Sequence, residues 1–126
     1  MGSYFMWDEN PDGGLNVRKQ MLSSSPNIIH SLDAALMQKV VVELREEHHI
    51  HSIAAIHDSF AVLPNNVDVM RDVIRDTAYR MFKGNWIAEE FTPYIHEYAP
   101  NVDLPDIPEQ GSFDVSEVLK AKYFFA

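Results

Sequence analysis

Two short apolar runs separated by three polar residues stand out in the chain. Residues 52–56 (SIAAI) precede His57-Asp58-Ser59, and residues 60–63 (FAVL) follow and end at a proline. Short runs rich in β-branched and aromatic residues, ended by breakers, predict a hairpin over about 52–63. Because its apolar and polar positions do not alternate, both faces are expected to be covered. Polar groups at such a turn are costly to bury unless they are hydrogen-bonded or ligated.

Apolar residues recur at helical spacing on both sides of this hairpin. We expect the first helix to begin at Ser31, as its N-cap, and to run to about His48. Its apolar stripe consists of Leu32, Leu36, Val40 and Leu44. We expect the second helix to follow Asn66 as its cap and to end before Gly84. Its apolar face consists of Met70, Val73, Ile74, Met81 and Phe82.

The remaining segments carry weaker signals. Residues 4–7 and 15–17 are expected to pair as a hairpin, and the run Ser23–Pro26 is expected to break the chain. We expect, in order, a helix, a loop, a short helix and a docked apolar tail at residues 88–98, 101–111, 115–120 and 123–126. The predicted fold class is α+β, with helices packed on a small antiparallel sheet.

The composition narrows the class of protein. With 126 residues, 46% of them hydrophobic, the chain is one domain or a piece of one. The absence of cysteine excludes disulfides and thiolate zinc sites. No apolar run approaches the roughly 20 residues that span a bilayer, and the start lacks the features of a signal peptide. We therefore expect a soluble, intracellular protein with no membrane partner.

The net charge of −9 argues against a free-standing nucleic-acid binder, because phosphate contacts need clustered Lys and Arg. The only basic density lies at Arg18-Lys19 and in the second helix. The basic residues of that helix are Arg71, Arg75, Arg80 and Lys83. If the chain meets nucleic acid, most of the positive surface must come from elsewhere.

Asp58 is the candidate with the clearest chemistry. A carboxylate at a strand turn is a hard oxygen ligand suited to Mg²⁺. Two-metal phosphoryl transfer needs a second carboxylate on a neighbouring element, and no other acidic residue lies on an apolar strand that would pair with this hairpin. The alternative that Asp58 hydrogen-bonds its own turn is equally open from the residues alone.

Other histidine chemistry is less favoured. Contiguous residues such as His57-Asp58-Ser59 point to alternate faces, which disfavours a catalytic triad. A zinc site from His48, His49 and His51 is disfavoured because histidines are also stabilised at a helix C-terminus. His30 is read as a core histidine in preference to a ligand-binding residue at a helix start.

Several blocks occur in a characteristic order. They are residues 18–20 (RKQ), 26–33 (PNIIHSLD), 56–60 (IHDSF), 111–114 (GSFD) and 123–126 (YFFA). From about residue 15 to the end, the chain resembles the single-subunit, phage-type RNA polymerases, which include the mitochondrial ones. The resemblance implies that residues 27–126 are a C-terminal palm segment with a C-terminal foot. Residues 1–26 would be an N-terminal hairpin and loop, a remnant of the fingers region.

The resemblance also implies roles for individual residues. Asp58 would bind the two Mg²⁺ ions that activate the RNA 3′ hydroxyl and hold the triphosphate, and His57 and Ser59 would support the turn. His30 would face the minor-groove side of the template–primer end, with Asn27 and Arg18 as further nucleic-acid-binding residues. The structural foot would be Phe125 and Ala126.

The family also needs parts that this sequence lacks. Its first metal-binding aspartate and its nucleotide-binding helix lie upstream. We therefore expect one segment of a DNA-directed RNA polymerase, inactive alone, whose partners are DNA template, RNA product, nucleoside triphosphates and the remaining polymerase segment or subunit. A split subunit and a gene fragment stay open, and a phage origin is favoured over a mitochondrial one. The alternatives are an inactive remnant, a palm segment of another polymerase class, and a histidine zinc protein.

Overall fold

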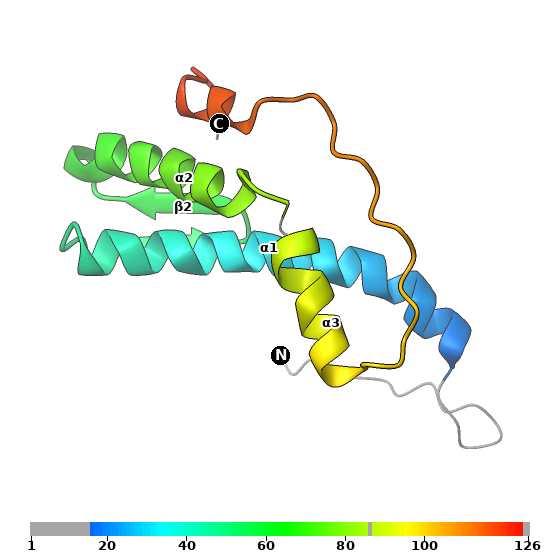
Figure 1. The fold of residues 1–126 in the computed structure, drawn as a ribbon. Helices are drawn as coiled ribbons and strands as arrows, with labels where there is room; N and C mark the ends of the chain where they lie inside the picture. Colours follow the sequence, from blue (N-terminus) through cyan, green and yellow to red (C-terminus); the bar gives the residue numbers. More distant parts are fainter. Residues whose placement is uncertain (1–15, 86, 125–126) are drawn as a thin grey trace. The chain divides into compact units, whose positions relative to one another are not determined.

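The computed structural model describes residues 16–85 and 87–124. The chain divides into two compact units, residues 1–35 and 36–126, and helix α1 contributes to both. Figure 1 shows the elements in chain order: α1 (Val17–Glu46), β1 (Ile53–Ile56), β2 (Ser59–Val62), η1 (Pro64–Asn66), α2 (Val67–Phe82), η2 (Ile87–Phe91), α3 (Thr92–Tyr98) and η3 (Val115–Leu119). Helices and one antiparallel pair of strands confirm the α+β class.

Helix α1 is longer than the sequence pattern predicts. It begins after Asn16, whose Oδ1 accepts a hydrogen bond of 3.0 Å from the Lys19 amide. The predicted break at residues 23–26 and the predicted N-cap at Ser31 are therefore wrong. Pro26 lies inside the helix, and the Ser31 hydroxyl donates to the carbonyl of Ile28 at 2.7 Å. The serine hydroxyl donates to a carbonyl of the preceding helical turn, and it does not draw the backbone into a non-helical turn.

The serines before Pro26 behave in the same way. Ser23 Oγ and Ser24 Oγ donate to the Gln20 carbonyl at 3.1 and 2.7 Å. The expected hairpin of residues 4–7 with 15–17 lies largely outside the described residues. Its last residue, Val17, is the first residue of α1, so that part of the prediction is wrong. No described helix has the length and apolar character that crossing a membrane requires.

The core of the second unit lies between α1 and α2, as the two apolar stripes predict. Its buried members are Leu36, Val40, Leu44, Ile50, Val73, Ile74 and Ala78. The hairpin side chains Ile53, Phe60 and Val62 pack against this core. Burial of these apolar groups is the main term that stabilises this arrangement.

The predicted hairpin is present, but only one of its faces is covered. β1 and β2 pair antiparallel with Ile53 opposite Val62 and Ile56 opposite Ser59. Partly buried and exposed residues alternate along both strands, and Ile56 is 71% exposed. The expectation that both faces are covered is therefore wrong for this chain. The inner face packs on the core, and nothing in the described residues covers the outer one.

Helix α2 follows Asn66 as predicted, although the Asn66 side chain makes no cap hydrogen bond. A short 3₁₀ turn that begins at Pro64 leads into it. Past the end of α2, the single helix expected over 88–98 is divided into the π-helical η2 and the α-helical α3. Pro93 lies in the first turn of α3, a position in which proline is common.

The C-terminal part contains the predicted loop and short helix. Asp114 caps η3, since its Oδ1 accepts from the Ser116 amide at 2.9 Å. That hydrogen bond holds the pKa of the Asp114 carboxyl below its ordinary value. Phe124 packs against the core, whereas Tyr123 is 77% exposed. The tail is therefore docked through Phe124, and the foot residues Phe125 and Ala126 lie outside the described residues.

Candidate functional site

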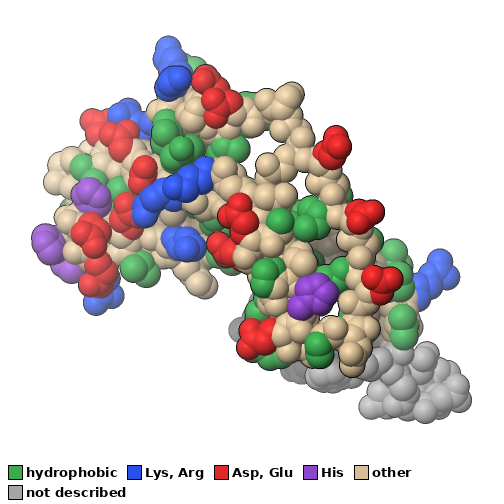
Figure 2. All heavy atoms as spheres, viewed as in Figure 1, with side chains coloured by type: hydrophobic (Ala, Val, Ile, Leu, Met, Phe, Trp, Pro, Cys, Tyr) green, Lys and Arg blue, Asp and Glu red, His purple; other side chains and the backbone are tan. Residues whose placement is uncertain are grey.

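Most of the basic residues of α2 are paired with acidic residues of the same helix. Arg71 lies 3.1 Å from Asp68 Oδ1 and 3.3 Å from Asp72 Oδ1, and Arg75 Nη1 lies 3.6 Å from Asp72. Lys and Arg side chains are mixed with Asp and Glu side chains on the face shown in Figure 2. Helix α2 is therefore not a free basic surface for a phosphate backbone.

A second polar cluster ties α1 to α2. Arg80 forms an ion pair with Glu43 of α1 and a 2.7 Å contact with Asp76. The buried Thr77 hydroxyl donates to Glu43 Oε2 at 3.2 Å. The hydrogen bond to Glu43 is the main reason that the pKa of Arg80 lies above its ordinary value; burial, the next largest effect, lowers it, and the charges of Glu43 and Asp76 raise it. These residues therefore have a structural role that periodicity alone does not reveal.

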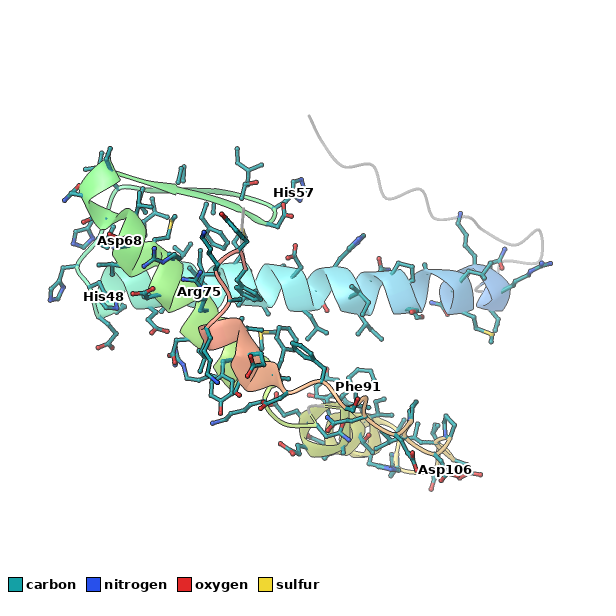
Figure 3. All side chains as sticks on the ribbon, turned by 90° about the horizontal axis from the view of Figure 1, so that it is seen from above. His48, His57, Asp68, Arg75, Phe91 and Asp106 are labelled. Carbon is teal, nitrogen blue, oxygen red and sulfur yellow. The ribbon has the colours of Figure 1, made fainter. Side chains whose placement is uncertain are left out.

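The predicted site lies at the tip of the hairpin. His57 and Asp58 are the two loop residues between the paired Ile56 and Ser59, and both are exposed. In Figure 3, His57 lies at this tip and His48 at the opposite end of the hairpin. His57 has a φ of 55°, a left-handed conformation that is unfavourable for a residue with a side chain. Positive φ at the first loop position suits the tight turns of hairpins, because it matches the twist of the strands.

The Asp58 carboxylate is uncommitted. It is exposed, and it makes no hydrogen bond or ion pair with any described residue. The alternative that Asp58 bonds its own turn is therefore not what the structure shows. An exposed carboxylate fits one position in the coordination shell of Mg²⁺. The described residues hold no group of three or more potential ligands, so Asp58 offers one ligand of a site.

Two cavities of the second unit lie outside the turn itself. An open cavity of about 400 Å³ lies between the end of α2 and residues 110–116, and another of about 530 Å³ lies beside Phe124. Neither His57 nor Asp58 lines either of them. Because reaction sites are usually concave, a second surface would be needed to make a site around Asp58.

The histidines after α1 form no metal centre. His48, His49 and His51 are exposed, and within the described part of the chain they belong to no group of metal-ligating side chains. His49 has a φ of 56°, and the next residue, Ile50, donates its amide to the Leu44 carbonyl at 2.9 Å. This left-handed residue turns the chain back so that Ile50 enters the core.

The candidate nucleic-acid-binding residues all lie on the first half of α1, but Arg18 is on the opposite helix face from Asn27. Asn27 and His30 are exposed and three residues apart, so they are neighbours on one helix face. Arg18 is exposed too, nine residues before Asn27, or about 14 Å along the axis. The prediction of a core histidine is wrong, because His30 is exposed in mid-helix. These residues belong to the first unit, and the hairpin turn belongs to the second.

Comparisons with known proteins point in one direction. A profile described as DNA-dependent RNA polymerase matches residues 1–98. The DNA-directed RNA polymerase of Enterobacteria phage T3 is 29% identical over 119 residues, 91% of this chain and 13% of the relative. DNA-directed RNA polymerase 1, mitochondrial, of Arabidopsis thaliana is 34% identical over 108 residues, 86% of this chain and 11% of the relative. No solved structure matches the chain significantly.

A shorter relative is covered more fully. DNA-directed RNA polymerase 1A of Nicotiana tabacum is 31% identical over 109 residues, 86% of this chain and 68% of the relative. These matches place the chain in the polymerase class of transcription proteins. The chain belongs to the DNA-dependent RNA polymerase family, in its single-subunit, phage-type branch. It spans about an eighth of the length of the phage T3 relative.

Proposed function

We propose that this chain is the C-terminal palm segment of a phage-type DNA-dependent RNA polymerase. In the reaction, an RNA 3′ hydroxyl attacks the α-phosphate of a nucleoside triphosphate on a DNA template, and pyrophosphate leaves. Asp58 supplies one of two metal-binding carboxylates. An upstream segment or partner subunit supplies the other, together with the nucleotide-binding helix.

The observation that carries this proposal is the uncommitted Asp58 carboxylate at the tip of a hairpin whose base is anchored in the core. Mg²⁺, when bound, supplies charge stabilisation to the attacking hydroxyl and the triphosphate. Asp58 holds hard oxygen ligands at a fixed place, because the hairpin register and the left-handed His57 define the turn. Since both residues of the turn are exposed, Asp58 can meet a second carboxylate on another surface.

The exposed side chains of α1 support a nucleic-acid role for the first unit. Arg18 offers a guanidinium to phosphate, while Asn27 and His30 offer groups that hydrogen-bond base edges or sugars. The remaining positive surface must come from the rest of the polymerase, since this chain carries a net charge of −9. Phe125 and Ala126 complete the segment as its foot.

The direct test removes the charge of the Asp58 carboxylate without changing the size of the side chain. The chain is combined with a polypeptide that carries the rest of the polymerase, and Mg²⁺-dependent RNA synthesis is measured on a DNA template. Asp58→Asn is expected to lower the rate by about 10³-fold or more, since a metal-stabilised transition state loses several kcal/mol.

The matched control is Asp106→Asn, the same change in an exposed loop. It is expected to leave the rate unchanged. An active mixture that tolerates Asp58→Asn as well as it tolerates Asp106→Asn would refute the role of Asp58. Incorporation of deoxyribonucleotides in preference to ribonucleotides would assign the segment to another polymerase class.

A further inference from the structure

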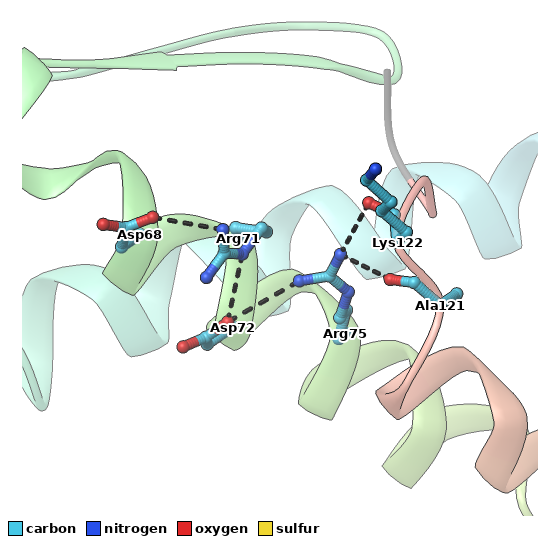
Figure 4. A network of polar contacts seen from close by, with 6 residues as sticks. All are labelled: Asp68, Arg71, Asp72, Arg75, Ala121 and Lys122. Atoms are coloured by element: carbon cyan, nitrogen blue, oxygen red, sulfur yellow. Dashed lines mark hydrogen bonds and ion pairs between the residues drawn. The ribbon is translucent and has the colours of Figure 1, made fainter.

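Arg75 of α2 reaches across to the C-terminal tail. Its Nη2 donates to the carbonyl of Ala121 at 2.6 Å and lies 3.4 Å from the carbonyl of Lys122, 46 and 47 residues away in sequence (Figure 4). Its Nη1 lies 3.6 Å from Asp72 Oδ1. The Arg75 side chain is only 11% exposed. All of these residues belong to the second unit.

The hydration that the Arg75 guanidinium loses on burial must be offset by other interactions. Burying a charge is unfavourable unless hydrogen bonds or an ion pair offset the loss of hydration. Among the described residues, Arg75 Nε is buried without a partner, so the compensation comes from Asp72 and the two tail carbonyls. Charge-assisted hydrogen bonds of this kind are roughly twice as strong as neutral ones. The energetics of the Arg75 side chain are therefore coupled to the tail.

Phe124 is a second anchor of the tail. Phe124 packs against the core two residues after Lys122, while Tyr123 between them is exposed. The guanidinium fixes the backbone, and the phenyl ring fixes the side chain next to it. Because the contacts from Arg75 go to carbonyls, they define the path of the tail whatever side chains it carries.

We propose that Arg75 is the positioning residue for the C-terminal tail, fixing residues 121–124 against α2 and thereby setting where the foot begins. The link from the tail to the foot rests on the proposed function, in which Phe125 and Ala126 form that foot. The fixing of the tail itself does not rest on it. Removing Arg75 is therefore expected to free the tail first and to reduce nucleotide addition only as a consequence.

Arg71 provides a matched control on the same helix. It lies one turn earlier, its side chain is 51% exposed, and it pairs with Asp68 and Asp72. Arg71→Met and Arg75→Met remove the same charge and keep an apolar stem. Only Arg75→Met removes contacts to the tail.

The first experiment measures the NMR order parameters of the backbone amides in the full chain. In the wild type those of residues 122–124 are expected in the rigid range, about 0.85, and in Arg75→Met below about 0.6, while those at the centre of α2 stay unchanged. Arg71→Met is expected to change neither region. Unchanged order parameters of the tail amides in Arg75→Met would overturn the proposal.

A thermodynamic cycle keeps the test decisive if Arg75→Met is destabilised as a whole. The melting temperature is measured for the wild type and Arg75→Met, each with and without residues 121–126. A tail-specific role predicts that the substitution lowers the melting temperature of the full chain and has little further effect once the tail is deleted. An equal decrease in both backgrounds would mean that Arg75 stabilises the core alone, and would overturn the proposal.

The activity measurement links the tail to the reaction. In the reconstituted polymerase, Arg75→Met is expected to lower kcat by the same factor as deletion of residues 121–126, with no additional loss in the double variant. Additive losses would contradict an action through the tail. If the unmodified mixture makes no RNA, the proposed function fails, and the order parameters and the cycle still decide the role of Arg75.

Discussion

At the scale of single residues, two histidines have left-handed backbones for different reasons. His49 reverses the chain after α1 and brings Ile50 into the core. His57 forms the hairpin turn and holds the neighbouring Asp58 at its tip. Strained backbone in an exposed turn is common where function constrains the residue. The left-handed backbone of His49 therefore serves the fold, and that of His57 shapes the turn that carries the proposed metal ligand.

We predict that glycine lowers the activity at position 57 and leaves it unchanged at position 49. Glycine relieves about 1–2 kcal/mol of left-handed strain but increases the entropy lost on folding by about 0.5–1 kcal/mol. His57→Gly and His49→Gly are each expected to leave the free energy of unfolding unchanged or raise it by up to about 1.5 kcal/mol. Only His57→Gly is expected to slow nucleotide addition, by about 10- to 100-fold, as loss of a supporting neighbour of a metal ligand does.

Denaturant unfolding of the chain and the rate of the reconstituted polymerase provide the two measurements. An equal loss of activity in His49→Gly would show that the effect is not specific to the turn. Full activity in His57→Gly would remove His57 from the site and leave Asp58 alone there.

At the scale of elements, α1 shows how a local breaker can be overridden. Pro26 has no amide hydrogen, so one bond of the helical ladder is missing, yet the helix runs from Val17 to Glu46. Most residues of its first half are exposed, so little tertiary packing offsets the proline there. The stability of this half is therefore sensitive to helix propensity.

We predict that Pro26→Ala increases the protection of amides in residues 17–25 by at least 10-fold in hydrogen exchange. Proline in a helix interior is less favourable than alanine by about 3 kcal/mol, although only part of this is expected at an exposed site. The control is Pro93→Ala in the first turn of α3, where proline fits and little change is expected. Equal effects at both prolines, or no effect at Pro26, would contradict an unbroken helix α1.

The predictable elements are those with a local pattern. The hairpin and α2 follow from apolar runs and spacing, and Asp58 is identified because it interrupts the apolar runs. The first half of α1 is missed because a serine run and Pro26 read as a loop, although the hydroxyls bond the helix instead. The contact from Arg75 joins residues 46 positions apart, and no local pattern contains that information.

At the scale of the whole molecule, many large apolar side chains are exposed in both units. Side chains exposed by at least 58% include Val17, Met21, Leu22, Ile29, Val42, Ile56, Tyr94 and Phe113. Isolated apolar residues on a surface are ordinary, but Ile56 lies on the uncovered face of a two-stranded sheet. Such a sheet has two unpaired edges, which favour pairing with another chain. The proposed upstream segment would cover this face in the polymerase.

We predict that the chain on its own self-associates through this hairpin. Sedimentation velocity over a concentration series is expected to show oligomers for the wild type and fewer for Ile56→Lys, because a lysine there opposes edge pairing. Val102→Lys is the control, since it makes the same charge change at a 47% exposed residue in a loop. If both lysine variants reduce association equally, repulsion between the chains is the cause and the hairpin is not the contact. If the wild-type chain stays monomeric at every concentration and melts cooperatively, the outer face of the hairpin needs no cover, and the proposed upstream segment loses its structural support.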